Sequence, residues 1–163
     1  MKWMPDEIYT SRGQVIIVSP EDWREMAQWF WNIGAAGYAQ RNIKLEDGRR
    51  ALSMMHREII GCTRGDGMQV DHRNLNRLDN RRDNLRKCSQ SENLWNRVSV
   101  PTSTSRFKGV SWCKRTGKWH AQIKCYGASK HLGYFDSEER AHEVYCLAAD
   151  LLHGEYANHG RQA

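Results

Sequence analysis

The sequence predicts an α+β protein built from two small units, and three observations lead to this prediction. The chain has 163 residues, 39% of them hydrophobic, and a mean hydropathy of −0.81, which is too polar for one large core. Short strand-like runs alternate with amphipathic helical runs along the chain. Residues 99–105, "SVPTSTS", are small and polar, which is the composition of a linker between two units.

Residues 1–60 predict a scaffold unit of strand–helix–strand type. Residues 14–18 form a short strand, after which Ser19 suits a helix cap and Pro20 the first helical position. "GYAQRNIKL" and "RRALSMM" flank the turn "EDG" and predict a hairpin, and "HREIIG" follows as a short helix or turn. The apolar residues that recur at helical spacing, and that predict an amphipathic helix packed on a sheet, are Trp23, Met26, Ala27 and Phe30.

Residues 61–98 carry the polar side chains that point to chemistry. One strand ends at Asp71 and His72, and a second short strand lies around residues 85–88. "SQSE" has the capping-box pattern, so Asn93 falls in the opening turns of a helix. Asn84 follows His72 by twelve residues, and Asn93 follows it by twenty-one.

The run "VDHRNLNRLDNRRDNLR…SEN" resembles the HNH homing-type endonucleases, and "MMHREIIG" resembles the segment that precedes the motif in phage and bacterial members. The resemblance implies a ββα-metal core, in which a β-hairpin and a helix surround one metal ion. It also implies a protein carried by a phage or mobile element and working in the host-cell cytoplasm. The chain departs from many relatives at "RNLN", which replaces an Ile and a Gly-containing turn.

Within this resemblance, each residue type suits hydrolysis of a phosphodiester. The imidazole of His72 titrates near working pH and can be the general base. Asp71 and Asn93 offer oxygen ligands to one Mg²⁺ or Mn²⁺ ion, which acts as Lewis acid and leaving-group clamp. Asn84 is expected to fix the orientation of His72 through a hydrogen bond. Because neighbouring strand residues point to opposite faces, Asp71 and His72 can share a site only where the strand ends and bends.

Residues 106–158 predict the second unit, a three-stranded antiparallel sheet packed on one helix, followed by a tail at 159–163. The strand-like runs are "FKGVSW", "KWHAQIKCY" and "KHLGYF". Asp136 and Glu139 suit the start of the helix, and Gly154 suits its end. The expected buried face of this helix consists of Ala141, Val144, Tyr145, Ala148, Leu151 and Leu152.

The second unit resembles the Apetala-type (ethylene-response-factor) DNA-binding domain, on the marks "FKGVSW", "GKWHAQI", "HLGYFDSEERAHEVY" and the final "AN". That resemblance implies a sheet lying in the major groove of DNA. Residues 101–135 hold seven basic residues and no acidic one, which is typical of a phosphate-facing surface, although a merely soluble basic face has the same composition.

Strand alternation indicates which side chains of the sheet face DNA. Along residues 118–124, the even-numbered Lys118, His120, Gln122 and Lys124 face outward, while Trp119, Ala121 and Ile123 face the helix. Gln122 suits adenine, and Lys108 or Lys124 suits guanine or a phosphate. The alternative for Trp112 and Trp119 is that their side chains only pack in the hydrophobic core. The expected DNA contacts are Arg73, Arg86 and Arg97 from the nuclease segment, and Lys108, Ser111, Trp112, Lys114, Arg115, Gln122, Lys124, Lys130 and His131 from the second unit.

The predicted function is thus a metal-dependent endonuclease acting on double-stranded DNA as a monomer or weak homodimer. Five scattered Cys without a CxxC pair predict reduced thiols and no zinc site, and we expect no organic cofactor. No apolar run is long enough to cross a membrane. The alternative is a DNA-binding regulator with an inactive nuclease core. A third hypothesis, an RNA-directed enzyme or binder, requires exposed aromatic side chains on the sheet.

Overall fold

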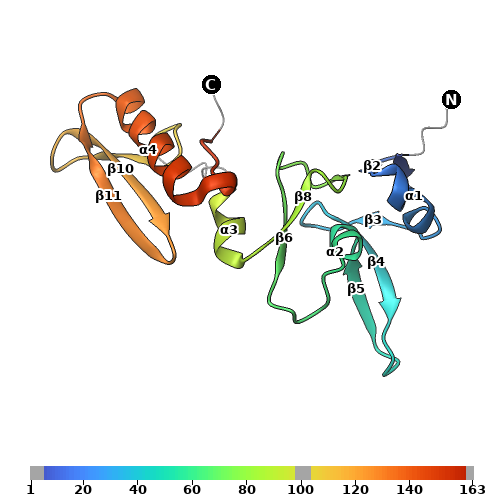
Figure 1. The fold of residues 1–163 in the computed structure, drawn as a ribbon. Helices are drawn as coiled ribbons and strands as arrows, with labels where there is room; N and C mark the ends of the chain where they lie inside the picture. The colour runs from blue at the N-terminus through green and yellow to red at the C-terminus, as the bar shows by residue number, and fades with distance from the viewer. Residues whose placement is uncertain (1–5, 98–103, 161–163) are drawn as a thin grey trace. The chain divides into compact units, whose positions relative to one another are not determined.

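The computed structural model describes residues 6–97 and 104–160, which form two compact units with the boundary between Ser89 and Gln90 (Figure 1). Most of the expected linker, residues 99–103, lies outside the described residues, as do residues 161–163 of the expected tail. Ser105, which we expected in the linker, is buried and donates a hydrogen bond of 2.6 Å to Glu138. The second unit therefore includes the end of the expected linker.

The first unit is organised around a three-stranded sheet that joins distant parts of the chain. Strands β1 (Glu7–Tyr9) and β2 (Val15–Val18) are antiparallel, and β7 (Asp79–Asn80) pairs with the other edge of β2 in parallel. Segments 1–60 and 61–98, which the sequence predicts as separate domains, thus share a sheet. They also share one hydrophobic core, which contains Ile8, Ile16, Val18, Met26, Trp31, Ala39, Met55, Ile59, Val70 and Leu85.

Helix α1 (Pro20–Met26) begins where the sequence predicts but is shorter than predicted. Met26 is buried, whereas Phe30 lies beyond the helix and is 98% exposed, so its assignment to the buried face was wrong. Ser19 precedes the helix without capping it through its side chain. Its hydroxyl instead accepts a hydrogen bond of 2.9 Å from the backbone N–H of Arg82.

The predicted hairpin is confirmed as β4 (Ala39–Lys44) and β5 (Arg50–Met54), with the short strand β3 (Asn32–Ile33) on the other edge of β4. Helix α2 (Met55–Ile60) follows β5 (Figure 1). It ends at Gly61, whose φ of +68° suits a residue without a Cβ. Strands β6 (Gln69–His72) and β8 (Leu85–Cys88) then form an antiparallel pair, also as predicted.

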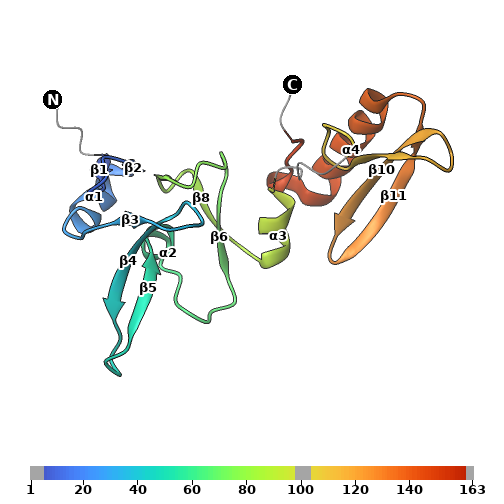
Figure 2. The same cartoon turned by 180° about the vertical axis from the view of Figure 1, so that it is seen from behind.

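The second unit contains the predicted three-stranded sheet and helix. Strands β9 (Val110–Cys113), β10 (Lys118–Cys125) and β11 (Ala128–Phe135) are antiparallel with β10 in the centre. Helix α4 (Glu138–His153) lies across this sheet and leads into the 3₁₀ turn η1 (Gly154–Tyr156) (Figure 2). The two core clusters between sheet and helix contain Val110, Ala121, Ile123, Ala141, Tyr145 and Ala149.

The buried face of α4 differs from the prediction at its C-terminal end. Ala141 and Tyr145 are buried as expected, but the next residues on this face are Ala149 and His153, and Leu151 is 85% exposed. This spacing of four residues follows one stripe of the helix. The helix is capped by Ser137, which accepts a hydrogen bond of 2.9 Å from Arg140 N–H, in place of the predicted Asp136 and Glu139.

Helix α3 (Gln90–Trp95) belongs to the second unit, where C-terminal residues hold it. The indole of buried Trp95 stacks on His153, with ring centroids 4.4 Å apart and planes 8° apart. The Asn158 amide donates hydrogen bonds to Asn96, of 2.7 Å to its carbonyl and 3.0 Å to its side chain. Across residues 6–97 and 104–160, no helix has the length and apolar character needed to traverse a membrane.

Candidate active site

The last two residues of β6, Asp71 and His72, lie where the chain leaves the strand. The backbone N–H of Leu75 donates to the His72 carbonyl at 2.9 Å, and Leu75 adopts a left-handed φ of +64°. The strand therefore ends in a tight turn directly after His72. Both side chains are buried, with 5% of Asp71 and 4% of His72 exposed.

The Asp71 carboxylate is paired with Arg86, its cross-strand neighbour on β8. The Nε and Nη2 atoms of Arg86 lie 2.8 and 2.7 Å from Oδ2 of Asp71, and both side chains are buried. The guanidinium thus offsets the cost of burying the carboxylate. Arg86 was predicted to contact DNA, but the structure buries it against Asp71 because the strand register places the two residues opposite each other.

The imidazole of His72 packs among other rings. His56 on α2 meets it edge-on, with centroids 5.2 Å apart and planes 76° apart, and Tyr38 lies 4.9 Å from His56 and 5.7 Å from His72. Burial lowers the pKa of His72 below its ordinary value, partly opposed by a hydrogen bond with Asn80 and by nearby Asp71. Burial also lowers the pKa of His56, to about 3. Both imidazoles are therefore neutral at neutral pH, and His72 is in the form that accepts a proton.

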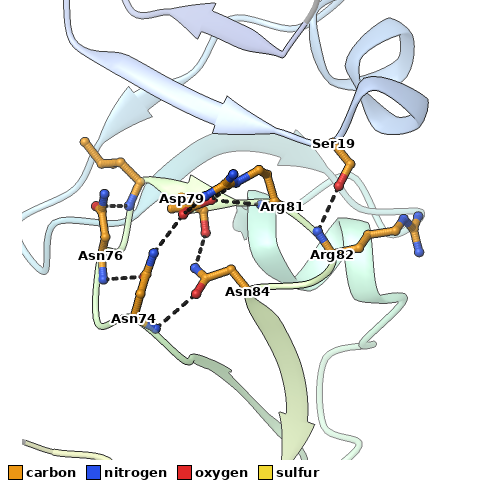
Figure 3. Close-up of polar contacts among 8 residues, drawn as sticks. Ser19, Asn74, Asn76, Asp79, Arg81, Arg82 and Asn84 are labelled. Carbon is orange, nitrogen blue, oxygen red and sulfur yellow. Dashed lines mark hydrogen bonds and ion pairs between the residues drawn. The ribbon is translucent and has the colours of Figure 1, made fainter.

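Asn80, and not Asn84 as expected from the sequence, lies beside the His72 imidazole. Oδ1 of Asn80, on β7, lies 3.4 Å from Nε2 of His72. Asn84 instead holds the loop after β6: its Oδ1 accepts from Asn74 N–H at 3.0 Å, and its Nδ2 donates to the Asp79 carbonyl at 2.7 Å (Figure 3). The amide expected to orient His72 is thus engaged by loop backbone.

The same loop contains a polar network that the sequence analysis missed. The buried carboxylate of Asp79 accepts from Asn74 at 2.8 Å and from the Arg81 guanidinium at 2.8 and 2.7 Å (Figure 3). The Arg81 hydrogen bond is the main reason why the pKa of Asp79 is lowered. Asn74 and Asn76 each accept from a backbone N–H two residues further on, at 2.9 and 3.1 Å. The two asparagines of "NLN" are the sequence signal for these turns, because Asn side chains accept hydrogen bonds from the backbone two residues further on.

Comparison with known proteins matches this segment to a family. A family model described as HNH endonuclease matches residues 56–94. The chain is 26% identical over 147 residues to a protein named Uncharacterized HNH endonuclease L560 from Acanthamoeba polyphaga mimivirus, covering 90% of this chain and 74% of that protein. It is 32% identical over 91 residues to Protein 3.8 of Escherichia phage T7, covering 56% of this chain and 74% of that protein.

The chain belongs to the HNH endonuclease family. The family model begins at His56 and spans His72, Asn80 and Asn84. It therefore includes the expected site residues and His56, whereas Tyr38 of the ring cluster lies outside the matched residues. No solved structure shows a significant match to the chain.

HNH nucleases use a divalent metal ion, and the oxygen donors expected to bind it lie in both units. Asp71 ends β6 in the first unit, and Asn93 is half-buried on α3 in the second. A carboxylate and an amide oxygen are hard donors, which suit Mg²⁺ or Mn²⁺. In residues 6–97 and 104–160, no three His, Cys, Asp or Glu side chains are grouped to hold a metal. Arg73, directly after β6, and Arg97, just beyond α3, are exposed.

In the second unit of this HNH protein, the predicted alternation along β10 is confirmed. Ala121 and Ile123 are buried under α4, whereas Gln122 and Lys124 are exposed on the outward face. The register pairs Gln122 with His131, so His131 shares that face. Other expected contacts also lie at accessible positions: Ser111 is half-buried opposite His120 on β9, and Lys114 and Arg115 are exposed in the turn between β9 and β10.

Three expected DNA contacts lie elsewhere in this unit. The Lys108 ammonium donates to the Trp95 carbonyl, and burial lowers its pKa to about 8. Lys130 is exposed but pairs with buried Ile123, so its Cβ points to the helix side of the sheet. Trp112 pairs with Trp119 on that same side and contacts it edge-on, with ring centroids 5.1 Å apart.

The outward face also carries an imidazole pair that the sequence analysis did not single out. Nε2 of His120 lies 2.7 Å from Nδ1 of His131, and their rings stack 4.8 Å apart. Tyr134 packs against both rings, at 5.2 and 4.8 Å. Because His120 and His131 are on different strands and eleven residues apart, only the β10–β11 register brings them together.

Proposed function

We propose that the chain is a DNA endonuclease that uses one Mg²⁺ or Mn²⁺ ion to hydrolyse phosphodiester bonds, leaving 5′-phosphate and 3′-hydroxyl ends. One observation carries this proposal: a buried, neutral His72 follows the Asp71 carboxylate at a strand end, inside the segment that matches the HNH endonuclease model. The family supports a nuclease acting on DNA, and the chemistry of these side chains supports the specific roles below.

In the proposed reaction, the neutral imidazole of His72 accepts a proton from the attacking water molecule. Asp71 and Asn93 would hold the divalent ion through their oxygen atoms. When bound, that ion supplies positive charge to the scissile phosphate and the departing 3′ oxygen. Asn84 contributes by holding the loop after β6, through its hydrogen bonds to Asn74 and Asp79.

We further propose that the second unit is a major-groove DNA-binding module. Its exposed outward positions combine a base-reading amide, Gln122, with the cation of Lys124 and the imidazole of His131. Lys114 and Arg115, in the neighbouring turn, suit phosphate contacts. Arg73 and Arg97 remain proposed phosphate contacts, because both are exposed and positively charged.

The direct test incubates the purified protein with a supercoiled plasmid library, with Mg²⁺ and then with EDTA. Metal-dependent nicking or linearisation, with 5′-phosphate ends, is the expected result. His72→Ala should abolish cleavage while leaving DNA binding intact in a gel-shift assay. His159→Ala is the matched control, because that histidine is in the second unit and pairs with Asp150.

One outcome would contradict the proposed nuclease activity and favour the alternative function, a DNA-binding regulator with an inactive nuclease core. That outcome is tight DNA binding by the wild-type protein without cleavage of any library member in Mg²⁺ or Mn²⁺. DNA binding would then be its only supported activity. The use of a library matters because an enzyme specific for one site leaves a single random plasmid intact.

A further inference from the structure

We infer that His120 and His131 act together as one DNA contact, which takes up a single proton when the second unit binds double-stranded DNA. The ligand chemistry is a group of hydrogen-bond acceptors on the duplex, either phosphate oxygens or the N7 and O6 atoms of guanine. This role rests on the proposed DNA-binding function of the second unit, and it uses no residue of the nuclease site.

The two imidazoles are joined by a hydrogen bond. Nε2 of His120 lies 2.7 Å from Nδ1 of His131, so one of these nitrogens donates through its N–H and the other accepts with its lone pair. If both imidazoles were protonated, neither of these nitrogens would have a lone pair, and two N–H groups would face each other. The pair is therefore neutral or holds one added proton, but it cannot hold two while the bond exists.

An added proton changes the hydrogen bonds that the pair offers to a ligand. The second nitrogen of each ring, Nδ1 of His120 and Nε2 of His131, has no hydrogen-bond partner within residues 6–97 and 104–160. In the neutral pair, one of these two nitrogens is a donor and the other an acceptor. In the protonated pair both are donors, so only the protonated pair suits two acceptors on DNA.

The pair lies on a sheet face whose charge suits a polyanion. His131 pairs with exposed Gln122 on the outward face, and exposed Lys124 lies two residues further along β10. Residues 101–135 contain seven basic residues and no acidic one. A duplex on this face therefore brings negative charge to a segment that has none of its own.

The surroundings of the pair do not favour an added proton in the free protein. Burial lowers the pKa of His120, and the neighbouring His131 lowers it further. The sheet face offers one carboxylate nearby, Asp136 just after β11, and it is paired with Lys118 at 3.0 Å. Helix α4 packs on the opposite side of the sheet. The other polar or titratable side chains on the outward face are Ser111 and Cys113 of β9, Gln122 and Lys124 of β10, and Ser129 and Tyr134 of β11.

Bound DNA reverses this preference. Phosphates near the pair favour its protonated form, so the pKa of the pair is higher in the complex than in the free protein. Because the complex then binds more protons, DNA affinity rises as the pH falls through the pKa of the complex. A tenfold difference between the two acid dissociation constants corresponds to about tenfold in DNA affinity.

Isothermal titration calorimetry of the full chain with a duplex selected from a random library tests this role. EDTA keeps the DNA intact, and two buffers of different ionisation enthalpy give the number of protons taken up per chain. The wild-type protein should take up at most one proton, and it should bind about tenfold more tightly at pH 6 than at pH 8.

Three variants separate the pair from other titrating groups. The double variant His120→Gln/His131→Gln stays polar but cannot titrate, so it should lose this proton uptake and most of the pH dependence. His131→Arg carries a permanent charge and should bind at pH 8 about as tightly as the wild type does at pH 6. His159→Gln is the matched control, because His159 is in the same unit but pairs with Asp150 of α4. Circular dichroism shows whether each variant is folded.

Selection of duplexes from the library at pH 6 and at pH 8 identifies the acceptors. A guanine enriched at one position only at pH 6 assigns the acceptors to N7 and O6 of that base. An equal gain in affinity for all sequences assigns them to backbone phosphates.

The remaining outcomes would contradict the role of the pair in different ways. DNA binding without proton uptake, or with uptake that persists in the double variant, would overturn this role and leave the proposed DNA-binding function standing. Uptake of two protons that disappears in the double variant would show two independent imidazoles and would overturn the shared proton. A wild-type protein that binds no duplex at either pH would overturn the DNA-binding function as well.

Discussion

The stability of the first unit depends on pH and on individual charges, because several of its ionisable side chains are buried beside one another. His56 and His72 are neutral imidazoles in ring contact, and Asp71 is a carboxylate paired with Arg86 across the β6–β8 ladder. Protonating one of these imidazoles, or removing the guanidinium, places unbalanced charge in a region with little water. Both effects are measurable as changes in stability.

The pH dependence of stability follows from His56. Its pKa is about 3 in the folded protein and 6.5 in the unfolded chain, so below pH 6.5 the unfolded chain binds more protons. The contribution of His56 to the free energy of unfolding is therefore fully present above pH 6.5. It is lost as the pH falls towards 3, by up to about 1.4 kcal/mol per pH unit. Urea unfolding between pH 7 and pH 5 measures it. His56→Phe, which cannot titrate, should lose less stability over that range, and an identical loss would contradict the assignment.

Arg86→Leu should destabilise the first unit by about 3–5 kcal/mol, because it leaves the buried Asp71 carboxylate without this guanidinium. The free energy of opening, measured by amide hydrogen exchange in β6 and β8, reports the loss. Arg49→Leu is the control, since Arg49 pairs with Asp47 at an exposed site and should change stability by less than about 1 kcal/mol. Equal effects of the two substitutions would refute the buried pairing.

At the scale of elements, the contact between β9 and α4 depends on a glycine. Gly109 has a φ of +75°, and a Cβ added there would lie 2.0 Å from Cδ2 of Tyr145, a buried residue of α4. The carbonyl of Gly109 also accepts a hydrogen bond of 2.9 Å from Gln122 N–H. The start of β9 is thus held between the central strand and the helix with no space for a side chain.

Gly109→Ala should therefore destabilise the second unit by about 2–5 kcal/mol, combining left-handed strain with a clash against Tyr145. Gly117→Ala is the matched control: its φ is +63°, but nothing lies within 4 Å of the added Cβ, so only about 1–2 kcal/mol of strain is expected. Thermal unfolding of the two variants separates strain from clash. Equal shifts in Tm would show that Tyr145 moves aside without cost.

At the scale of the whole molecule, the positive charge is unevenly distributed. The net charge is +6, and residues 101–135 hold seven basic residues without an acidic one. Some of these cations are engaged inside the protein, as Lys108 is with the Trp95 carbonyl, while Lys124 is exposed on the outward sheet face. Charge count alone therefore overstates the number of cations available to DNA.

DNA affinity should depend steeply on salt, and Lys124→Ala should reduce the slope of log K against log salt by about 1. Binding isotherms between 50 and 200 mM salt measure this slope. Lys44→Ala removes an exposed lysine from β4 in the first unit and should leave the slope unchanged. A slope that falls equally in both variants would indicate unspecific attraction to the whole basic protein rather than contact through the outward face.

The sequence alone determined the features that depend on neighbours a few residues apart. Period-two alternation predicted the faces of β10, turn residues predicted the β4–β5 hairpin, and the spacing of Asp71, His72 and Asn84 indicated the HNH family. These patterns are readable because local backbone preference and the alternation of side chains act within a single element.

Only the tertiary structure decided how distant elements pair, and it thereby reassigned several residues. The parallel pairing of Val18 with Asn80 brings Asn80, rather than Asn84, to His72, and the β6–β8 register turns Arg86 from an expected DNA contact into the partner of Asp71. These pairings form because the strands bury one shared core. Burial is a property of the assembled surfaces, which the order of polar and apolar residues in one segment does not encode.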